Sequence, residues 1–255
     1  MANGEFAGRT VLVTGGSRGI GRAVCLRLAG TGARIAFNYA SDTAAAEKTL
    51  AELEATGAAC RMYRADIADL DQTADMFKRI EADLGPVDLL VANAGIARKI
   101  DAADMGPEVW REIMSVNLDG TFHTVWCAKD GMLARGFGRI VCISSVTGLV
   151  ANPIAPQRLI AYGTSKAAII GFTRNCARAF GPDVRVNCVA PGVIETEMTA
   201  DITDAAREQM FAAMPLKRFG QPEEIAEMVH FLLSERSSYT TGQTFVASGG
   251  LVTLP

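Results

Sequence analysis

Short runs of β-branched and aliphatic residues alternate along the chain with longer segments in which hydrophobic positions recur every three or four residues. The short runs are typical of strands buried on both faces, and the longer segments are typical of amphipathic helices that cover a sheet. The expected strands span residues 10–14, 34–39, 60–65, 87–94, 139–145, 184–190 and 243–248. The expected helices span residues 19–31, 42–56, 69–84, 107–135 and 162–180. This alternation predicts an α/β fold of the Rossmann type, a doubly wound parallel sheet of seven strands flanked by helices.

One domain is expected for the whole chain, residues 1–255, because we find no internal repeat, low-complexity tract or linker-like segment. Two stretches lack a clear period. The first, residues 146–160, contains Pro153 and Pro156, and the second, residues 192–221, has only weak helical periodicity. Irregular segments on a rigid α/β scaffold commonly carry binding residues, so we expect both stretches to form substrate loops.

Charge and composition argue against several classes of protein. A net charge of −3 and a pI near 5.5, with Lys and Arg scattered along the chain, make nucleic acid an unlikely partner on electrostatic grounds. The first residues do not resemble a signal segment, and no apolar run approaches the roughly 20 residues that span a bilayer. We therefore expect a cytoplasmic protein that makes no use of a membrane.

The cysteines favour neither a disulfide scaffold nor a metal site, because they form no CxxC pair and no regular spacing. Most of them lie in apolar surroundings, where a reduced thiol behaves as a small hydrophobic group. The six positions are Cys25, Cys60, Cys127, Cys142, Cys176 and Cys188.

A glycine-rich turn follows the first expected strand. The stretch TGGSRGIG, residues 14–21, leads from that strand into a helix, and its glycines are Gly15, Gly19 and Gly21 in a GxxxGxG arrangement rather than GxGxxG. Such a turn lets the backbone approach a phosphate closely while the helix N-terminus offers unpaired N–H groups. It could equally be a tight turn that packs a helix on a sheet, so the surrounding motifs have to decide.

Tyr162 and Lys166 lie one helical turn apart within AYGTSKAAIIGF, residues 161–172, and therefore share one face of a helix. An exposed Tyr and Lys on a surface helix is one interpretation. The other is chemical, because a neighbouring ammonium favours the phenolate form of a tyrosine whose pKa is otherwise about 10.

Taken together, the motifs resemble the short-chain dehydrogenase/reductase family. The matching stretches are TGGSRGIG, NAGI at 93–96, Ser145 before VTG, YGTSK at 162–166 and APGVIET at 190–196, and they occur in the order of the family across nearly the whole chain. The resemblance implies an enzyme that transfers hydride between a nicotinamide cofactor and a carbonyl or alcohol.

The resemblance assigns four catalytic residues. Tyr162 donates a proton to the carbonyl oxygen, and Lys166 lowers the pKa of Tyr162 and holds the nicotinamide ribose. Ser145, at the end of the fifth strand, polarises the carbonyl, while Ser144 points to the opposite side of that strand. Asn117 matches the asparagine that holds a water behind the lysine, although it could also satisfy backbone groups at a helix kink.

The end of the second strand indicates which cofactor is used. Tyr39 stands about where NAD-preferring relatives carry an aspartate, so no carboxylate at that point repels a 2′-phosphate. Arg18 supplies a cation, and Asn38 and Ser41 supply neutral donors. Asp42 is the nearest acid but is expected to be the N-cap of the following helix. These residues favour NADP(H).

Other cofactor contacts follow from the resemblance alone. The two histidines, His123 and His230, match no role in the family and are expected to be structural. The resemblance places the adenosine, phosphate and nicotinamide parts of the cofactor against Gly15, Ser17, Gly19, Ile20, Gly21, Ala40, Asp66, Ile67, Asn93, Ala94, Gly95, Pro191, Gly192, Val193 and Thr196.

The substrate is less well defined. NYAS, IETEM, PLKRFGQPEEIA and TTGQTFVASGG resemble the 3-oxoacyl-(acyl-carrier-protein) reductases of fatty acid synthesis. An acidic carrier protein calls for a basic docking rim, for which Arg135, Arg139, Arg158 and Arg174 are candidates. The alternatives are an NADPH-dependent reductase of free ketones, sugars, steroids or other secondary alcohols, and a non-catalytic sensor of NADP(H).

The segment between Ser145 and Tyr162 is longer than in many relatives. It carries Leu149, Ile154 and Leu159, and it forms either a wall of the substrate pocket or an unimportant loop extension. Assembly into a homotetramer is expected through the helices at 107–135 and 162–180, with the C-terminal SGGLVTLP at another two-fold interface.

Overall fold

The computed structural model describes residues 4–98, 100–151 and 159–253. Seven parallel strands form one sheet in the order β3-β2-β1-β4-β5-β6-β7, which confirms the doubly wound fold predicted from the hydrophobic pattern. The strands are β1 (Thr10–Val13), β2 (Arg34–Tyr39), β3 (Cys60–Arg64), β4 (Val87–Ala92), β5 (Gly138–Ile143), β6 (Val184–Pro191) and β7 (Thr244–Ala247). The order reverses between β1 and β4, and a ligand crevice is expected there at the carboxyl ends of the strands.

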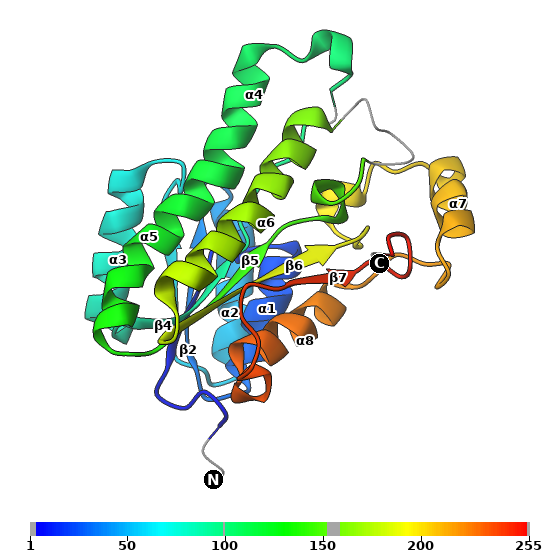
Figure 1. Cartoon of the computed structure of the whole chain (residues 1–255). Coiled ribbons are helices and arrows are strands. Elements are labelled where there is room, and N and C mark those ends of the chain that lie inside the picture. Colours follow the sequence, from blue (N-terminus) through cyan, green and yellow to red (C-terminus); the bar gives the residue numbers. More distant parts are fainter. Residues whose placement is uncertain (1–3, 99, 152–158, 254–255) are drawn as a thin grey trace.

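Helices cover both faces of this sheet (Figure 1). Helices α1, α2 and α8 supply the core on one face, and α3, α5 and α6 supply it on the other. The helices are α1 (Gly19–Ala29), α2 (Thr43–Ala55), α3 (Leu70–Leu84), α4 (Pro107–Met114), α5 (Gly120–Ala134), α6 (Ile160–Phe180), α7 (Asp204–Ala213) and α8 (Pro222–Leu233).

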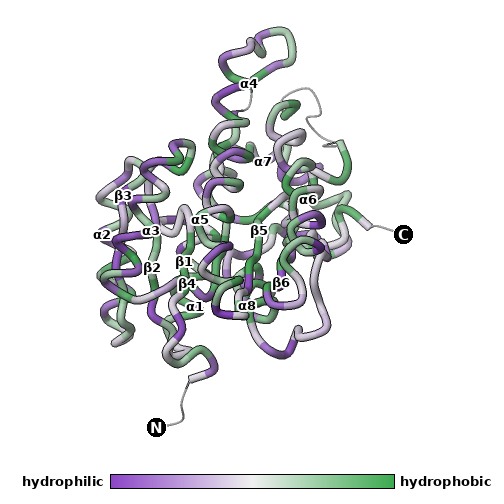
Figure 2. Tube along the Cα trace, turned by 60° about the vertical axis from the view of Figure 1, so that its left-hand side comes forward, coloured by the Kyte–Doolittle hydropathy of each residue, from purple (hydrophilic) through white to green (hydrophobic). Residues whose placement is uncertain are grey.

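The side-chain alternation of the strands builds two separate cores. Val11 and Val13 of β1 face the core under α1 and α8, whereas Leu12 between them faces the core under α3 and α5. All three side chains are fully buried, which explains why the strand is a continuous hydrophobic run. Figure 2 shows the hydrophobic colour along strand β5, between helices of mixed character.

The helix expected at 107–135 is not continuous. Helix α4 passes into a π-helical turn, Ser115–Asp119, before α5 begins at Gly120. The extra residue per turn widens the helix where Asn117 is completely buried, and such π turns commonly accompany functional positions. The chain is therefore helical over the predicted range, and the π turn interrupts the α-helical hydrogen bonding at its centre.

Two helices were missed by the sequence analysis. Helix α7 lies within the segment expected to be irregular, and its periodicity is weak because Met210 is its only fully buried side chain. Helix α8 has clear sequence signals, since Pro222 occupies its first turn and Gln221 and Glu224 form a capping box. These signals were sufficient to predict it.

The cysteines and histidines are structural, as expected. All six cysteines are free thiols, and only Cys127 is not fully buried. His123 Nδ1 lies 2.9 Å from the carbonyl oxygen of Ile67, and His230 Nε2 lies 2.6 Å from Glu5 Oε2, so both rings join separate segments of the fold.

The described residues contain neither a candidate membrane span nor a candidate metal cluster. None of the helices in this part of the chain is long and apolar enough to cross a membrane. The same residues contain no group of three or more histidine, cysteine, aspartate or glutamate side chains that could hold a metal ion.

Candidate active site

The expected catalytic residues meet at the carboxyl end of β5. Lys166, buried on α6, donates a hydrogen bond from Nζ to the carbonyl oxygen of Ile143, 2.9 Å away. Ser144 Oγ donates to the Lys166 carbonyl oxygen at 2.7 Å and so anchors α6 to the strand end. The expectation that Ser144 turns away from the reaction site agrees with this contact, which leaves Ser145 to face the pocket.

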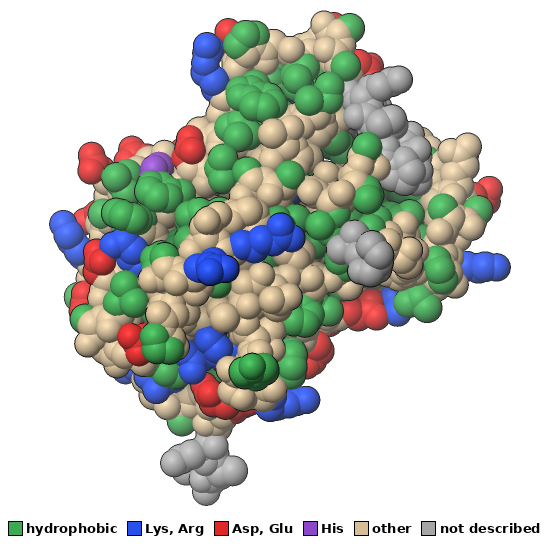
Figure 3. Space-filling model, viewed as in Figure 1, with side chains coloured by type: hydrophobic (Ala, Val, Ile, Leu, Met, Phe, Trp, Pro, Cys, Tyr) green, Lys and Arg blue, Asp and Glu red, His purple; other side chains and the backbone are tan. Residues whose placement is uncertain are grey.

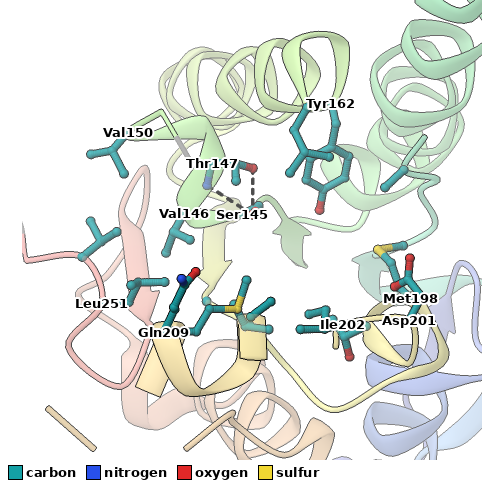
Figure 4. A pocket seen from close by; sticks show the side chains of 18 of the residues that line it. Ser145, Val146, Thr147, Val150, Tyr162, Met198, Asp201, Ile202, Gln209 and Leu251 are labelled. Atoms are coloured by element: carbon teal, nitrogen blue, oxygen red, sulfur yellow. Dashed lines mark hydrogen bonds between the residues drawn. The ribbon is translucent and has the colours of Figure 1, made fainter. Parts of the chain in front are cut away.

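Ser145 caps a short 3₁₀ turn, Val146–Gly148, that starts the first substrate loop. Its Oγ accepts hydrogen bonds from the backbone N–H of Thr147 at 3.2 Å and from Thr147 Oγ1 at 3.0 Å. Figure 4 shows these bonds and the Tyr162 side chain reaching into the same pocket. The cap holds the Ser145 hydroxyl at the pocket wall, where Tyr162 also lies.

Burial dominates the electrostatics of Tyr162 and Lys166. The Lys166 Nζ lies 5.7 Å from the centre of the Tyr162 ring. Burial raises the pKa of Tyr162, and a hydrogen bond with Ser145 lowers it by a smaller amount. Burial also lowers the pKa of Lys166 to about 8. The expectation that Lys166 lowers the pKa of Tyr162 remains a prediction, because the upward shift in the protein alone comes from the removal of water around the phenol.

Asn117 lies in the π turn and bonds to the strand-end segment beside the lysine. Its Oδ1 accepts a hydrogen bond from Ile96 N at 2.7 Å, and its Nδ2 donates to Ile96 O and to Ser165 Oγ, each at 3.0 Å. A Cβ on Gly95 would lie 3.1 Å from Asn117 Oδ1 and 3.3 Å from Lys166 Nζ. Asn117 thus satisfies backbone groups at a helix irregularity, and its water-holding role remains a prediction.

The glycine-rich turn packs tightly against the NAGI segment. Gly15 has a φ of +63°, and a Cβ there would lie 2.9 Å from the Ala94 Cα. Asn93 Nδ2 donates to the carbonyl oxygens of Thr14 and Gly15, at 2.9 and 3.2 Å. The turn is therefore a packed structural element, and this packing by itself is enough to require glycine at position 15.

The same turn also has the features of a phosphate site. Arg18 is the N-cap residue of α1, yet its side chain makes no capping hydrogen bond to the first turn. By contrast, Asp42 and Asp69 cap α2 and α3 by accepting from Ala45 N and Gln72 N. The first turn of α1 therefore keeps N–H groups for an anionic ligand.

A second cleft, of about 280 Å³, opens beside this turn. Arg22 and Lys48 line it in addition to Arg18, and neither was picked out from the sequence because α1 and α2 meet only in the fold. Arg18 Nη1 lies 2.6 Å from Glu197 Oε2 and 3.4 Å from Asp42 Oδ2. The residues that line the cleft are Ser17, Arg18, Gly19, Arg22, Ala45, Lys48, Thr49 and Glu197.

The end of β2 differs in part from expectation. Asp42 is the N-cap of α2, as predicted. Asn38, however, is buried, with its Oδ1 accepting from Gly15 N at 3.4 Å and its Nδ2 donating to Ala65 O at 2.8 Å. Its amide hydrogens are directed to backbone oxygens, so the prediction that Asn38 donates to a cofactor phosphate is wrong. Tyr39 packs in the core, whereas Ser41 is exposed beside the strand end.

The remaining predicted contacts surround the strand ends. Asp66 is exposed just beyond β3. Ile67 is buried, and its side chain packs so closely on Gly120 that a Cβ there would lie 2.7 Å from Ile67 Cδ1. Thr196 lies directly over the glycine turn, since a Cβ on Gly19 would be 3.2 Å from Thr196 Cγ2. The segment after β6 is therefore brought against the phosphate turn.

The main pocket has a volume of about 480 Å³ and is largely apolar (Figure 4). Three separate segments form most of it: residues 145–150 with Leu159 and Tyr162, residues 192–210, and the C-terminal pair Leu251 and Val252. Ala97 completes the lining. Val146, Val150, Val193, Met198, Ile202 and Met210 provide much of its apolar surface, and Thr147, Asp201 and Gln209 are among its polar residues.

This pocket supports the predicted substrate loops, with one correction. Leu149, expected in the wall, instead packs against the hydrophobic core. Leu251 and Val252 also line the pocket, for which no sequence signal distinguishes them, and their expected place at a subunit interface remains a prediction. Pro153, Ile154, Pro156 and Arg158 lie outside the described residues.

Two of the four arginines predicted to form a basic rim for a carrier protein lie away from the pocket. Arg135 donates to the carbonyl oxygen of Val87, the first residue of β4, at 2.8 Å. Arg139 lies at the start of β5 and pairs with Glu235 at 2.9 Å. Both are therefore at the amino ends of the strands, opposite the pocket, and their predicted docking role is wrong. Arg174 is exposed on α6.

A family model described as "Enoyl-(Acyl carrier protein) reductase" matches residues 15–252. The chain belongs to the short-chain dehydrogenase/reductase family. The match spans the glycine-rich turn, the predicted catalytic residues and both predicted substrate loops, so it confirms the resemblance drawn from the separate motifs.

Individual relatives support the same assignment. The chain is 39% identical over 244 residues to the 3-oxoacyl-(acyl-carrier-protein) reductase FabG of Staphylococcus aureus strain Mu50, covering 95% of this chain and 98% of the relative. It is also 39% identical over 244 residues to the acetoacetyl-CoA reductase of Rhizobium meliloti strain 1021, covering 95% of this chain and 98% of that relative. A short-chain dehydrogenase from Burkholderia cenocepacia J2315, solved in complex with NADP, superposes with a TM-score of 0.89 at 31% identity, covering 97% of this chain and 99% of the other.

Proposed function

We propose that this oxidoreductase uses NADPH to reduce a carbonyl group to a secondary alcohol, with a 3-oxoacyl thioester as the favoured substrate. The observation that carries the proposal is the placement of Ser145 and Tyr162 on the wall of one apolar pocket, with buried Lys166 on the same helix as the tyrosine. An apolar cavity that contains a proton donor and a polarising hydroxyl suits a ketone flanked by an aliphatic chain.

The residues around the glycine turn fit a phosphorylated dinucleotide. The α1 N-terminus would hold the pyrophosphate, and Arg18, with Lys48 in the same cleft, would hold the 2′-phosphate. The relative from Burkholderia cenocepacia was solved with NADP, which supports this choice. Bound NADPH would supply the hydride that reduces the carbonyl carbon.

The protein residues supply the proton and the orientation. Because burial raises the pKa of Tyr162, its hydroxyl is protonated at neutral pH and can donate to the carbonyl oxygen. The Ser145 hydroxyl, held by the 3₁₀ cap, would orient the same oxygen. Lys166 would hold the nicotinamide ribose, and Asn117 would position the water that returns the proton to Tyr162.

The substrate preference rests on the relatives and on the pocket. One relative is named for 3-oxoacyl groups on a carrier protein and another for acetoacetyl-CoA, so both act on a ketone two carbons from a thioester. With Arg135 and Arg139 on the opposite edge, carrier-protein docking would have to use Arg174 or other cations. A thioester lacking the carrier is therefore part of the test.

A homotetramer is proposed for the assembly. Hydrophobic side chains gather on the face formed by α4, α5 and α6 (Figure 3). Phe122 is 39% exposed and Trp126 is 50% exposed, and their rings stack at 5.4 Å. Exposed aromatic patches of this kind mark subunit interfaces. Light scattering should give four subunits for the wild type and fewer for Trp126→Glu.

The test of function is oxidation of NADPH, followed by its absorbance, with a panel of carbonyl compounds. The panel contains a 3-oxoacyl thioester, free 3-oxo esters, diketones, sugars and steroids, and NADH is run in parallel. Fast turnover of the thioester with NADPH is expected. Turnover confined to a free ketone would reassign the substrate, and tight NADPH binding without any turnover would favour the non-catalytic sensor.

A further inference from the structure

One ion pair connects the phosphate turn to the wall of the substrate pocket. Arg18 Nη1, at the start of α1, lies 2.6 Å from Glu197 Oε2, which belongs to the segment after β6. The two residues are separated by 179 positions in sequence. Both side chains are partly exposed, at 50% and 69%, so the pair is open to competition by a dissolved anion.

Glu197 is held by a well-ordered local structure. It is the first residue of a 3₁₀ turn, Glu197–Thr199, in which Thr199 Oγ1 accepts from Thr196 N at 3.0 Å and donates to Ile194 O at 2.8 Å. Met198 and Thr199, the next two residues, line the main pocket. The position of the Glu197 carboxylate is therefore tied to the position of the pocket wall.

Among the cations that line the cleft, Arg18 is the one that pairs with Glu197. Arg22 is already engaged by Glu52 through both its Nε, at 2.8 Å, and its Nη2. Lys48 lines the same cleft. Asp42 caps α2 through Oδ1, and its Oδ2 is a second, more distant partner of Arg18 Nη1 at 3.4 Å. A phosphate entering this cleft would meet the Glu197 carboxylate beside the guanidinium that it needs.

We propose that Glu197 determines cofactor specificity by competing with the 2′-phosphate of NADP(H) for Arg18. Binding of the phosphate displaces the carboxylate, because two anions cannot both occupy the same face of the guanidinium without repulsion. The displacement breaks the ion pair that links the 3₁₀ turn, with its pocket residues, to the glycine turn. The inference rests on the proposed use of NADP(H), and it adds a residue that couples the cofactor phosphate to the substrate loop.

The substitution Glu197→Gln tests the competition by equilibrium binding, without turnover. Isothermal titration with adenosine 2′,5′-bisphosphate should show binding about 2- to 5-fold tighter than in the wild type, the range expected for removing an exposed ion-pair competitor. Binding of adenosine 5′-monophosphate should not change. The gain should shrink at high salt, where exposed charges are screened.

A matched control lies in the same segment. Glu195 pairs with Arg207 at 2.6 Å and is absent from the phosphate cleft, so Glu195→Gln makes the same charge change without touching Arg18. Hydrogen exchange adds an independent measurement. The bisphosphate should speed amide exchange over residues 196–203 of the wild type, and Glu197→Gln should show that faster exchange without any nucleotide.

The outcomes separate this proposal from the proposed function. Tight bisphosphate binding that Glu197→Gln leaves unchanged, or a gain that Glu195→Gln reproduces, overturns the role of Glu197 and leaves the NADPH assignment standing. If the wild type, Glu197→Gln and Glu195→Gln all bind the bisphosphate as weakly as the monophosphate, the NADPH assignment and this proposal are overturned together.

Discussion

Lys166 on α6 donates a hydrogen bond from its Nζ to the carbonyl oxygen of Ile143, the last residue of β5, at 2.9 Å. This bond fixes a buried ammonium at the strand end and sets the rotation of α6 against the sheet. Since Tyr162 lies one turn earlier on the same helix, its hydroxyl is directed at Ser145, which follows the strand. The distance between acid and polarising group is thus set by helix-to-strand packing.

Tyr162→Phe removes the proposed proton donor while keeping the ring. We expect kcat for carbonyl reduction to fall about 10²- to 10⁴-fold, the usual contribution of general acid catalysis, with NADPH affinity unchanged. Steady-state rates and a fluorescence titration of NADPH provide the measurements. Tyr63→Phe is the control, because the Tyr63 hydroxyl bonds to Asp83 away from the pocket. Normal turnover by Tyr162→Phe would remove the residue from its assigned role.

The rate of reduction should fall as the pH rises through the pKa of Lys166. Burial lowers this pKa to about 8, so the lysine is an ammonium below that pH and neutral above it. The pKa of Tyr162 is raised, so the phenol keeps its proton over the same range. We expect kcat/KM to decline with an apparent pKa near 8. Lys166→Arg keeps its charge at this pH and should abolish the decline; a profile unchanged by it would exclude Lys166 as the titrating group.

Thr14→Val should destabilise the junction between the glycine turn and the NAGI segment. Thr14 Oγ1 accepts hydrogen bonds from Asn93 N at 3.0 Å and Ala94 N at 3.1 Å, and valine offers no acceptor. We expect a loss of about 1–3 kcal/mol in the free energy of unfolding, measured with urea. Thr14→Ser retains the hydroxyl and is the control. Equal stability of Thr14→Val and the wild type would contradict the structural role of these bonds.

Ala206→Phe should narrow the substrate pocket. Ala206 on α7 lines the cavity, whereas its neighbour Ala205 is exposed and does not. Overfilling a cavity costs about 1–3 kcal/mol, so KM for a long 3-oxoacyl thioester should rise about 5- to 150-fold, with a smaller effect on a four-carbon ester. Ala205→Phe should behave as the wild type. If Ala206→Phe and Ala205→Phe have the same KM for the long thioester, the acyl chain binds elsewhere.

The strands and the chemical motifs could be predicted from the sequence because their causes are local. A strand buried on both faces must be hydrophobic at successive positions, as β1 is at Val11, Leu12 and Val13. The pairing of Tyr162 with Lys166 follows from the helical repeat. Helix α8 also had local signals in Pro222 and Glu224, so its omission was an error of interpretation.

Other features depended on contacts between distant segments. Asn38 looked like a donor for a phosphate, but its amide oxygen accepts from Gly15 N and its amide nitrogen donates to Ala65 O. Only folding brings these two backbone groups to the side chain. Arg135 and Arg139 looked like docking cations until the sheet placed them at the edge opposite the pocket. The Leu251 side chain reaches the pocket because the chain beyond β7 turns back over it.

The sequence by itself determined the fold class and the family, and it predicted the phosphate turn and the catalytic residues, because periodicity and short motifs encode local geometry. The tertiary structure decided how the groups interact. Burial, which depends on all surrounding segments, raised the pKa of Tyr162 and lowered that of Lys166. The contact between Arg18 and Glu197 likewise exists only because the segment after β6 folds over the first glycine turn.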